Sequence, residues 1–361
     1  MHVLALTTPG LDRSGVRPLG RARIGERQVD LASASVARPP FDPDHPDSRG
    51  RVLLHVEAFS ANFRDKALCL TAADHLRSTG RGSISFLGSE FCGRVVQRGA
   101  GVEGLAVGDR VVGDGTYPRR SGSELLGGIV TNRASRGWLV LHESQVCAVP
   151  RLMGPDVAAA FALGAQTAQS MVRRGGVSAG SRVLVMSGRS NTSLFLAQCA
   201  AAAGGTVSVL SRGRWVPEHL DALPAGAEVL AVEGVLGMAE QFDVVLDPFF
   251  DLNVARALRA LDYGGRYVTC GLQAQHPSFA EPAEPAPVVD VLGTAIVKNL
   301  SLIGNCIGER ADLDRALALY EEGALSVRLD SVWGPQEGVA FLERTFSAPD
   351  RFGKVVMRYA A

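Results

Sequence analysis

The sequence predicts an α/β fold joined to a separate all-β region, and three features of the chain support this prediction. Residues 181–214 read as a strand, a polar loop, a helix and a second strand. Apolar strands follow at 243–246 and 267–270, so strand and helix alternate as in a doubly wound parallel sheet. Before residue 150 the chain instead shows short strands between Gly-rich turns, at 51–59, 93–97, 109–113 and 137–149. That spacing is typical of a barrel-like β region.

The segment 181–214 is the expected nucleotide-binding unit. Its first strand is expected at Val183 to Met186, and its alanine-rich helix at Leu194 to Ala203. Gly204 and Gly205 end the helix, and Val207 to Leu210 forms the next strand. The unpaired amides at the start of such a helix, together with the helix dipole, favour the pyrophosphate of a dinucleotide.

The loop between this strand and helix departs from the usual G-x-G-x-x-G fingerprint, because Gly188 is the one glycine left in it. Small hydroxyl and amide side chains can still turn the chain and donate hydrogen bonds to phosphate. The predicted cofactor contacts in the loop are Ser187, Gly188, Arg189, Ser190, Asn191 and Thr192. An ordinary strand-to-helix turn with a Ser or Thr cap is the alternative interpretation.

The end of the second strand favours NADPH over NADH. A free ribose 2'-hydroxyl usually meets Asp or Glu at this position, whereas a 2'-phosphate meets positive charge. Here the strand runs into Ser211, Arg212, Gly213 and Arg214, without a carboxylate. We therefore predict that Ser211, Arg212 and Arg214 contact the cofactor, with a solvated turn as the alternative.

Length and composition narrow the function classes. A chain of 361 residues is long enough for two domains, and its formal net charge of zero argues against nucleic acid or an anionic membrane as partners. No apolar run approaches the ~20 residues needed to cross a bilayer, and the start lacks a charged segment followed by a long apolar one. A cytoplasmic protein is expected. Six scattered cysteines without a CxxC pair suggest neither a disulfide framework nor a zinc ribbon.

Three further segments complete the expected organisation. The spacing predicts a helix from Pro155 to Val172, stopped at Arg173 to Gly176. A turn at Tyr263 to Gly265 is expected to introduce the strand at 267–270. The proline-rich segment 276–293 is expected to be either a lid over a pocket or an unremarkable exposed loop.

Several separated stretches together resemble the medium-chain dehydrogenase/reductase superfamily over nearly the whole chain. They include SANFRDKAL (60–68), LGSEFCGRVVQRGAGVEGLAVGDRV (87–111), DVVLDPFF (243–250), LDYGGRYVTCG (261–271), VKNLSLIGN (297–305) and RFGKVVM (351–357). Within the superfamily, the NFRD and GSE segments look like the zinc-free quinone oxidoreductase and enoyl reductase branch.

The resemblance implies a Rossmann doubly wound parallel sheet inserted into a GroES-like β-barrel catalytic domain. The catalytic domain would comprise residues 1–150 and 302–361, and the dinucleotide-binding domain residues 151–301. The resemblance also implies a homodimer formed largely through the Rossmann domain, with cofactor and substrate meeting in the cleft between domains.

The resemblance allows a test for zinc. Zinc-dependent members place a Cys near Asn62, a His-Glu pair at Ser89 and Glu90, and another Cys or Asp near Gly164 and Ala165. A catalytic zinc needs three protein ligands from Cys, His or carboxylate, and here only Glu90 is retained. Residues 113–140 contain no cysteine for a structural zinc lobe. No metal is expected.

Without a Lewis acid, hydride transfer to an activated C=C bond remains accessible, because the conjugated carbonyl stabilises the negative charge. The expected substrate is a small-molecule or peptide-borne alkene, namely an enone, a quinone, an enoyl thioester or a dehydroamino acid. Asn62 matches the Asn of the family's motif and is the leading candidate for an amide donor in the pocket, with a turn-forming role as the alternative. Through the same resemblance, Thr167, Asp247, Gly271 and Lys354 are expected cofactor contacts.

The proton donor is left open. Many polyketide enoyl reductases carry a Tyr shortly after NFRD, but this chain reads KALCLTAADHL there. Cys69 and Tyr117 are the catalytic candidates, alongside Thr71, His75 and solvent. The altered phosphate loop and the missing Tyr also leave a second hypothesis, an NADPH-binding protein with little or no catalysis that serves as a sensor or partner subunit. A zinc alcohol dehydrogenase is disfavoured by the absent ligands.

Overall fold

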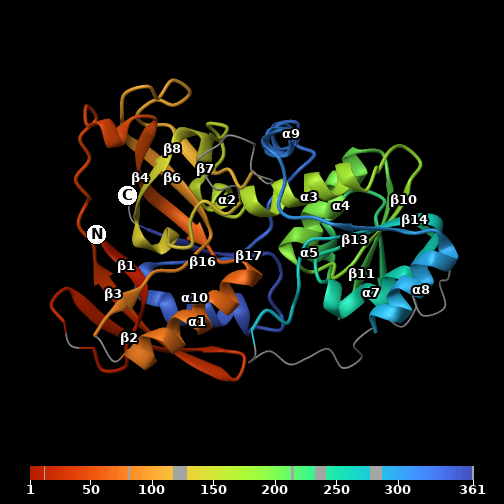
Figure 1. The fold of residues 1–361 in the computed structure, drawn as a ribbon, viewed down its shortest axis with the longest axis horizontal. Coiled ribbons are helices and arrows are strands. Elements are labelled where there is room, and N and C mark those ends of the chain that lie inside the picture. Colours follow the sequence, from red (N-terminus) through yellow and green to blue (C-terminus); the bar gives the residue numbers. More distant parts are fainter. Residues whose placement is uncertain are drawn as a thin grey trace. The chain divides into compact units, whose positions relative to one another are not determined.

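The computed structural model describes residues 1–11, 13–79, 82–116, 128–212, 215–231, 241–276 and 287–359. The chain divides into two compact units (Figure 1). Unit 1 comprises Met1–Gly115, Ile129–Leu163 and Leu329–Ala361, and unit 2 comprises Thr116–Gly128 and Gly164–Arg328. Unit 1 is therefore assembled from three segments, and its last segment is far from the other two in the sequence.

Unit 1 contains a seven-stranded sheet in the order β16-β17-β4-β6-β7-β9, with β8 also pairing with β4. Its strands are β4 (Arg51–Ser60), β6 (Glu90–Arg98), β7 (Arg110–Gly113), β8 (Trp138–His142), β9 (Val146–Ala148), β16 (Leu329–Trp333) and β17 (Lys354–Arg358). The strand expected at 137–149 is divided into β8 and β9. The 3-10 turn Glu143–Gln145 interrupts it, because the His142 side chain caps that turn and the Gln145 side chain returns to the His142 backbone.

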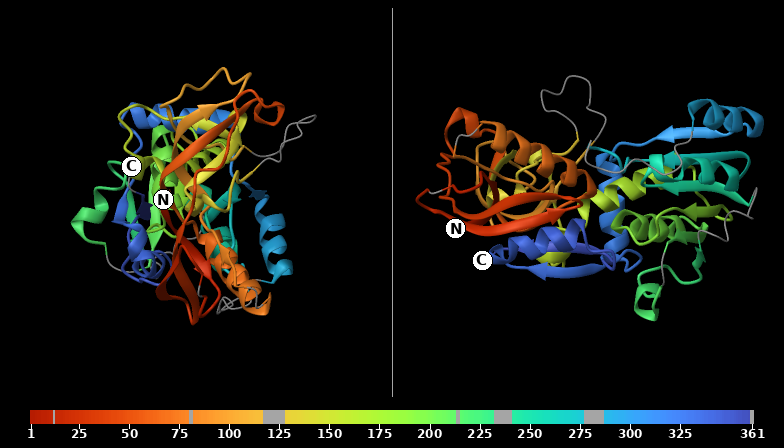
Figure 2. Two further views of the ribbon diagram at one scale, coloured as in Figure 1. Left: turned by 90° about the vertical axis from the view of Figure 1, so that its left-hand side faces the viewer. Right: turned by 90° about the horizontal axis from the view of Figure 1, so that it is seen from below.

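A second, four-stranded sheet of unit 1 has the order β2-β3-β1-β5. Its strands are β1 (His2–Thr7), β2 (Val16–Ile24), β3 (Arg27–Ser35) and β5 (Ile84–Ser85). Helix α10 (Gly338–Phe346) packs against β2, and helix α1 (Phe63–Thr79) packs against β1 and β3 (Figure 2). The Phe59 and Phe341 rings meet edge to face at 5.4 Å between centroids, which joins β4 to α10 in the core.

Unit 2 is built on a six-stranded parallel sheet in the order β12-β11-β10-β13-β14-β15. The strands are β10 (Arg182–Val185), β11 (Thr206–Ser211), β12 (Glu228–Ala231), β13 (Phe242–Asp247), β14 (Leu261–Thr269) and β15 (Ser301–Gly304). In Figure 1, α3 (Ala162–Arg174) and α4 (Asn191–Ala202) lie on one side of this sheet, and α7 (Phe250–Ala260) and α8 (Val288–Lys298) lie on the other. The predicted doubly wound sheet is confirmed, and its strand order reverses between β10 and β13.

Three predicted elements differ from the observed ones. The helix expected from Pro155 to Val172 is broken into α2 (Pro155–Ala158) and α3. Helix α4 begins at Asn191 rather than Leu194, because the Ser190 side chain caps it. The turn predicted at Tyr263 to Gly265 lies within the span of β14 rather than before it. Leu261 pairs with Phe242 and the pairing resumes at Arg266 with Val244, so residues 262–265 form an irregularity in the ladder, with Gly264 at φ +74°.

The remaining elements are short or lie at the edges of the units. They are the 3-10 turns Pro46–Ser48, Ala134–Arg136 and Pro335–Glu337, and the helices α5 (Pro217–Leu220) and α9 (Arg310–Glu321). Of the proline-rich segment 276–293, residues 277–286 lie outside the described ranges and the last part forms the start of α8. None of the helices in the described ranges has the length and apolarity needed to cross a bilayer.

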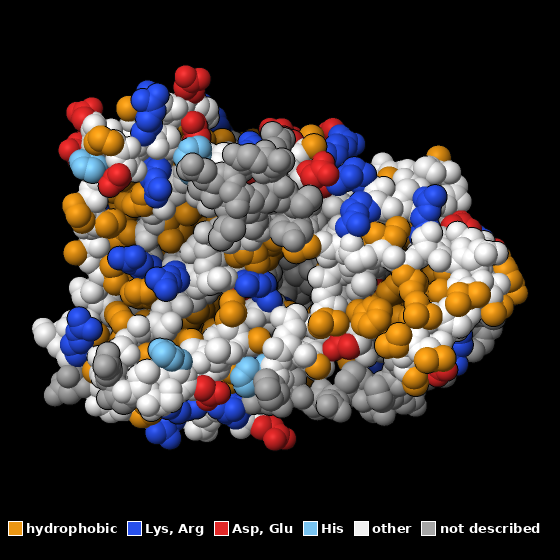
Figure 3. Space-filling view, in the orientation of Figure 1, with side chains coloured by type: hydrophobic (Ala, Val, Ile, Leu, Met, Phe, Trp, Pro, Cys, Tyr) orange, Lys and Arg blue, Asp and Glu red, His pale blue; other side chains and the backbone are white. Residues whose placement is uncertain are grey.

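The outer face of α8 is unusually apolar. Val288, Val289, Ile296 and Val297 are 71 to 79% exposed, and Leu292 is 50% exposed. Figure 3 shows hydrophobic side chains gathered over the region of α7 and α8. Strand β15 is an edge strand of the six-stranded sheet and pairs with β14. Most of its residues are exposed.

Candidate functional site

The loop between β10 and α4 turns with a single glycine. Ser187 has a φ of 56°, a left-handed conformation that glycine adopts more easily. At Gly188 a Cβ atom would lie 2.1 Å from Cγ1 of Val209, so no larger residue fits there without movement of β11. Ser190 caps α4 by accepting a hydrogen bond from the Ser193 N–H at 3.1 Å, and the Ser193 hydroxyl donates to the Met186 carbonyl at 2.7 Å. The loop therefore reaches the helix start in a defined, capped conformation.

A pocket of about 200 Å³ lies at the carboxyl ends of β10 and β11, beside the first turns of α7. It is lined by Ser187, Arg189, Leu210, Ser211, Arg212, Leu252, Asn253 and Arg256. Three of these side chains are arginines, two are serines, and none is a carboxylate. This position, outside the carboxyl ends of the strands where the strand order reverses, is where doubly wound sheets bind ligands. The lining suits an anion of phosphate type.

Asp247 lies behind this pocket rather than in it. Its side chain is fully buried and accepts hydrogen bonds from Asn253 Nδ2 at 2.8 Å, the Phe249 N–H at 2.9 Å and the Tyr267 hydroxyl at 2.6 Å. Asn253 Nδ2 also lies 3.2 Å from Ser187 Oγ. Burial raises the pKa of Asp247, and these three donors oppose the shift. Asp247 thus holds Asn253 against the loop.

The other predicted cofactor residues are placed as follows. Asn191 and Thr192 form the first turn of α4 and are partly exposed. Thr167 is buried in α3, and Gly271 follows β14, where a Cβ would lie 2.7 Å from the Pro248 carbonyl oxygen. Arg214 and Tyr117 lie outside the described residues.

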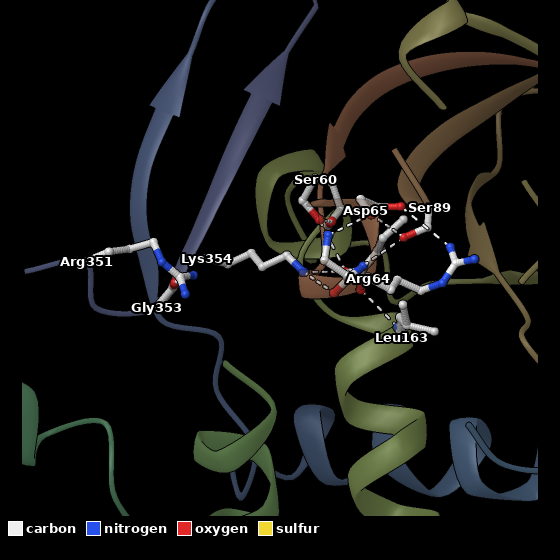
Figure 4. A network of polar contacts seen from close by, with 11 residues as sticks. Ser60, Arg64, Asp65, Ser89, Leu163, Arg351, Gly353 and Lys354 are labelled. Carbon is white, nitrogen blue, oxygen red and sulfur yellow. Dashed lines mark hydrogen bonds and ion pairs between the residues drawn. The ribbon is translucent and has the colours of Figure 1, made fainter. Parts of the chain in front are cut away.

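In unit 1, the residues of the NFRD and GSE segments meet in a polar cluster that we call the Glu90 network. Its members are Ser60, Asn62, Asp65, Ser89, Glu90 and Lys354 (Figure 4). Glu90 is buried and accepts four hydrogen bonds. They come from Lys354 Nζ at 2.9 Å, the Leu163 N–H at 2.9 Å, Ser60 Oγ at 3.2 Å and Asn62 Nδ2 at 3.2 Å. The ion pair with Lys354 balances the buried charge.

Lys354 does not line the phosphate-type pocket of unit 2. Its side chain is 4% exposed and extends from the start of β17 to Asn62 and Glu90 (Figure 4). The Lys354 ammonium donates to Asn62 Oδ1 at 2.5 Å. The structure therefore joins two predicted site residues, Asn62 and Lys354, that are far apart in the sequence.

Asp65 forms the other end of the network. It accepts hydrogen bonds from the Asn62 backbone N–H at 2.7 Å and from Ser89 Oγ at 2.6 Å, and it pairs with Arg64 at 3.5 Å. Burial raises the pKa of Asp65, and the hydrogen bonds and charge of these partners only partly offset that rise. Because Asp65 caps the chain at Asn62, the local fold of the NFRD segment depends on it.

At three positions where zinc-dependent members carry metal ligands, the polar side-chain atoms are hydrogen-bonded to other groups of this protein. Asn62 Oδ1 faces an ammonium, Ser89 Oγ donates to Asp65, and Glu90 receives four donors. Within the described ranges, no three side chains from His, Cys, Asp and Glu gather as a group that could hold a metal ion. This set of donors does not fit a catalytic zinc, which takes three ligands from Cys, His and carboxylate.

Cys69 is the described proton-donor candidate, and it is buried in α1 at 1% exposure. Burial and the nearby charge of Asp65 both raise the pKa of its thiol. The group therefore keeps its proton and is shielded from solvent.

Sequence reasoning missed four pocket residues, Leu210, Leu252, Asn253 and Arg256, of which the last two are polar. Asn253 and Arg256 lie three and six residues after the start of α7, and the pairing of β13 with β10 brings this helix to the loop that follows β10. The strand ending at Asp247 and followed by a helix was a usable signal, because the first turns of that helix start at the same edge of the sheet.

Comparisons with known proteins agree with this architecture. The family model described as the alcohol dehydrogenase GroES-like domain matches residues 48–151. A solved structure of a thermostable alcohol dehydrogenase from Pyrobaculum aerophilum, with cobalt and zinc bound, is 27% identical, with a TM-score of 0.74 and 99% of both chains covered.

Two relatives of known activity are also similar. Polyketide synthase GfsB of Streptomyces halstedii is 31% identical over 231 residues, which are 63% of this chain and 4% of that protein. The chain thus spans a small part of this relative. Acryloyl-coenzyme A reductase of Sulfurisphaera tokodaii is 24% identical over 264 residues, which are 66% of this chain and 73% of that protein. Together with the two-unit fold and the parallel sheet, these similarities show that the chain belongs to the medium-chain dehydrogenase/reductase superfamily of oxidoreductases.

Proposed function

We propose that the protein is an NADPH-dependent reductase of an activated C=C bond and that it works without zinc. The observation that carries this proposal is the pocket of unit 2 lined by Arg189, Arg212 and Arg256 without a carboxylate. A ribose 2'-phosphate is an anion that such a lining would hold, whereas NADH offers a 2'-hydroxyl that usually meets Asp or Glu.

The residues of the loop fit the remainder of the cofactor. Ser187, Gly188 and the first turn of α4 present small residues and helix amides of the kind that bind pyrophosphate. When bound, NADPH supplies a hydride. The chain's own contribution is to hold the cofactor and to stabilise the charge that develops on the substrate.

The choice of a C=C bond rests on the Glu90 network and on two relatives. Reduction of a saturated ketone by these enzymes relies on a Lewis acid, and the donors of the Glu90 network do not suit one. One relative is named an acryloyl-coenzyme A reductase, which places an α,β-unsaturated thioester in its name, and another is named a polyketide synthase. An α,β-unsaturated thioester is therefore the first substrate class to test, followed by enones, quinones and dehydroamino acids.

We further propose that unit 1 is the catalytic domain and unit 2 the dinucleotide-binding domain of a cytoplasmic homodimer. The exposed aliphatic face of α8 and the outer edge of β15 support a second copy of this chain as the occupant (Figure 3). Apolar surface of this extent, next to an unpaired strand edge, is favourable to bury.

The test is turnover. Purified protein is mixed with NADPH and an acryloyl or crotonyl thioester, in the presence of a strong chelator, and NADPH oxidation is followed by absorbance. The proposal predicts consumption of NADPH, a saturated product by mass spectrometry, and the same rate with and without chelator. Loss of activity with the chelator contradicts the zinc-free mechanism. Tight NADPH binding without turnover of any alkene class favours the non-catalytic nucleotide-binding protein.

A further inference from the structure

Asn62 is the exposed tip of an otherwise buried network. The other five members of the Glu90 network, Ser60, Asp65, Ser89, Glu90 and Lys354, are all buried, whereas Asn62 is partly accessible. A molecule that approaches the network from solvent therefore meets the Asn62 amide first.

The contacts fix which way this amide points. A lysine ammonium can only donate, so the atom that faces Lys354 must be the Asn62 carbonyl oxygen. Both hydrogens of the amide nitrogen then point toward Ser89 Oγ and Glu90 Oε2. Lys354 thereby settles the side-chain orientation that diffraction data alone often leave open.

The hydrogen bonds around Asn62 are unequal. The bond from the Lys354 ammonium is charge-assisted and is the shortest of the three, at 2.5 Å. The two bonds that the amide nitrogen donates are both 3.2 Å long, at the weak end of the N–H···O range. The carbonyl side of Asn62 is held tightly, and its N–H groups are held loosely. They can be exchanged for a better acceptor.

An ammonium bound to the amide oxygen also makes the amide a stronger donor. The ammonium withdraws electron density from the C–N unit of the amide. Hydrogen bonds that are linked in series polarise one another. Glu90 pairs with this buried lysine side chain at 2.9 Å, and Glu90 is itself held by Ser60 and the Leu163 backbone. Ser60 is in turn anchored to the Ala159 carbonyl at 2.6 Å.

We propose that Lys354 is a positioning residue that orients and polarises Asn62, so that the Asn62 amide donates to the carbonyl oxygen of an α,β-unsaturated substrate as that oxygen gains negative charge. The inference rests on the proposed function for the reaction itself. It assigns Lys354 to the substrate side, rather than to the cofactor contacts expected from the sequence. In the reduction, hydride adds to the β-carbon, the C=C electron pair moves to form the enolate, and a proton from solvent then completes the α-carbon.

The test is a double-mutant cycle between Asn62→Ala and the paired replacement of Lys354→Met with Glu90→Gln. Both members of the ion pair are replaced together, because either change alone would leave a buried charge without its partner and endanger folding. Lys66→Met serves as the matched control, since it makes the same substitution four residues from Asn62 and Lys66 contacts the Phe63 ring instead.

Relative to wild type, Asn62→Ala should lower kcat about 100-fold, as removal of one donor to a developing oxyanion does, and the paired replacement of Lys354→Met with Glu90→Gln about 10-fold. The kcat of the combined variant should be at most about 2-fold below that of Asn62→Ala, because Lys354 acts through Asn62. NADPH affinity should stay unchanged throughout. The proposal is overturned if the losses in kcat multiply in the combined variant. It is also overturned if NADPH binds more weakly to the Lys354 variants.

A second measurement does not need turnover. Cinnamoyl-coenzyme A, a chromophoric unsaturated thioester, is bound in the absence of NADPH, and its absorbance is recorded. Polarisation of its carbonyl by Asn62 predicts a red shift in wild type and Lys66→Met. The shift should be lost with Asn62→Ala and reduced when Lys354→Met and Glu90→Gln are combined. A shift without turnover refutes the proposed function and supports the inference, whereas turnover without a shift refutes the inference.

Discussion

At the scale of single residues, the proposed nucleotide site depends on where a side chain is tolerated and where it is not. Ser187 carries the left-handed turn that glycine usually supplies, and Gly188 stands where Val209 of β11 leaves no room for a Cβ. The loop thus keeps its glycine where space is lacking and makes its left-handed turn with a serine. The sequence could predict the loop and its Gly188, but not which loop residues line the pocket.

Gly188→Ala tests this packing. The added Cβ would lie 2.1 Å from Cγ1 of the fully buried Val209, so β11 or the loop must move. Overpacking of this kind costs about 1 to 3 kcal/mol. Urea denaturation should show that loss, and NADPH binding should weaken with it. Gly293→Ala, inside α8 and with open space for the new Cβ, is the matched variant. It should lose no stability and gain up to about 1 kcal/mol, because Ala is the better helix former.

Arg256→Ala tests the pocket residue that sequence reasoning missed. Loss of one charged hydrogen-bond partner of a phosphate costs about 1.5 to 3 kcal/mol, or roughly 10- to 150-fold in affinity. NADPH should weaken by that factor, and NADH much less. Arg259 lies on the same helix, donates to the Ala255 carbonyl and does not line the pocket, so Arg259→Ala should leave both affinities unchanged. Equal weakening of the two cofactors by Arg256→Ala would contradict the 2'-phosphate assignment.

At the scale of elements, strands are held together by charge as well as by backbone pairing. Glu57 on β4 accepts hydrogen bonds from Arg94 on β6 and Arg110 on β7, each at 2.7 Å to Nε. Burial alone would raise the pKa of Glu57, but the hydrogen bonds and charges of Arg110 and Arg94 outweigh it and hold the pKa below its ordinary value. This cluster ties three neighbouring strands of unit 1.

The lowered pKa of Glu57 predicts the sign of an acid effect on stability. A carboxyl group whose pKa is depressed in the folded state contributes stability above its unfolded pKa of about 4.3, and that contribution is lost as the pH falls through the folded pKa. Glu57→Gln should therefore lower the free energy of unfolding at pH 7 and flatten its decline below pH ~4.3. Denaturant unfolding at several pH values measures both. An unchanged acid slope in Glu57→Gln would show that other carboxyl groups dominate.

The same scale shows where sequence reasoning failed. The span of β14 includes Tyr263, Gly264 and Gly265, residues whose composition predicts a turn. In the register with β13 the pairing passes from Leu261 to Arg266, where pairing with β15 also begins, so the local preference of these residues survives as an irregularity inside the strand, with Gly264 at a positive φ. Helix α4 began earlier than expected because the apolar pattern of its helix does not reveal the Ser190 cap.

At the scale of the whole molecule, the order of elements along the chain was enough to predict a doubly wound sheet together with a β-rich unit. Alternation of strands and helices after residue 180, and its absence before, carries that information. The Glu90 network was beyond such reasoning in detail. Its members come from β4, α1, β6, β17 and the residues just before α1 and β6, and the contact between Asn62 and Lys354 follows only from the pairing of β17 with β4.

The apolar face of α8 predicts self-association. Val289 and Ile296 are 79% and 75% exposed, and β15 offers an unpaired strand edge among the described residues. Light scattering should give the mass of a dimer for the wild type and that of a monomer for Val289→Asp with Ile296→Asp. Val107→Asp, which changes a 62% exposed valine in unit 1, should remain dimeric. A monomeric wild type, or a dimer that survives both α8 changes, would contradict this interface.

The central claim is that a phosphate loop with one glycine and an arginine-lined pocket bind NADPH. Fluorescence titration of the purified protein with NADPH and with NADH tests it most directly, because it needs no substrate. The account predicts tight binding of NADPH, binding of NADH at least about 10-fold weaker, and a loss of that preference in Arg212→Ala with Arg256→Ala. Equal affinity for the two cofactors, or no binding of either, would contradict it.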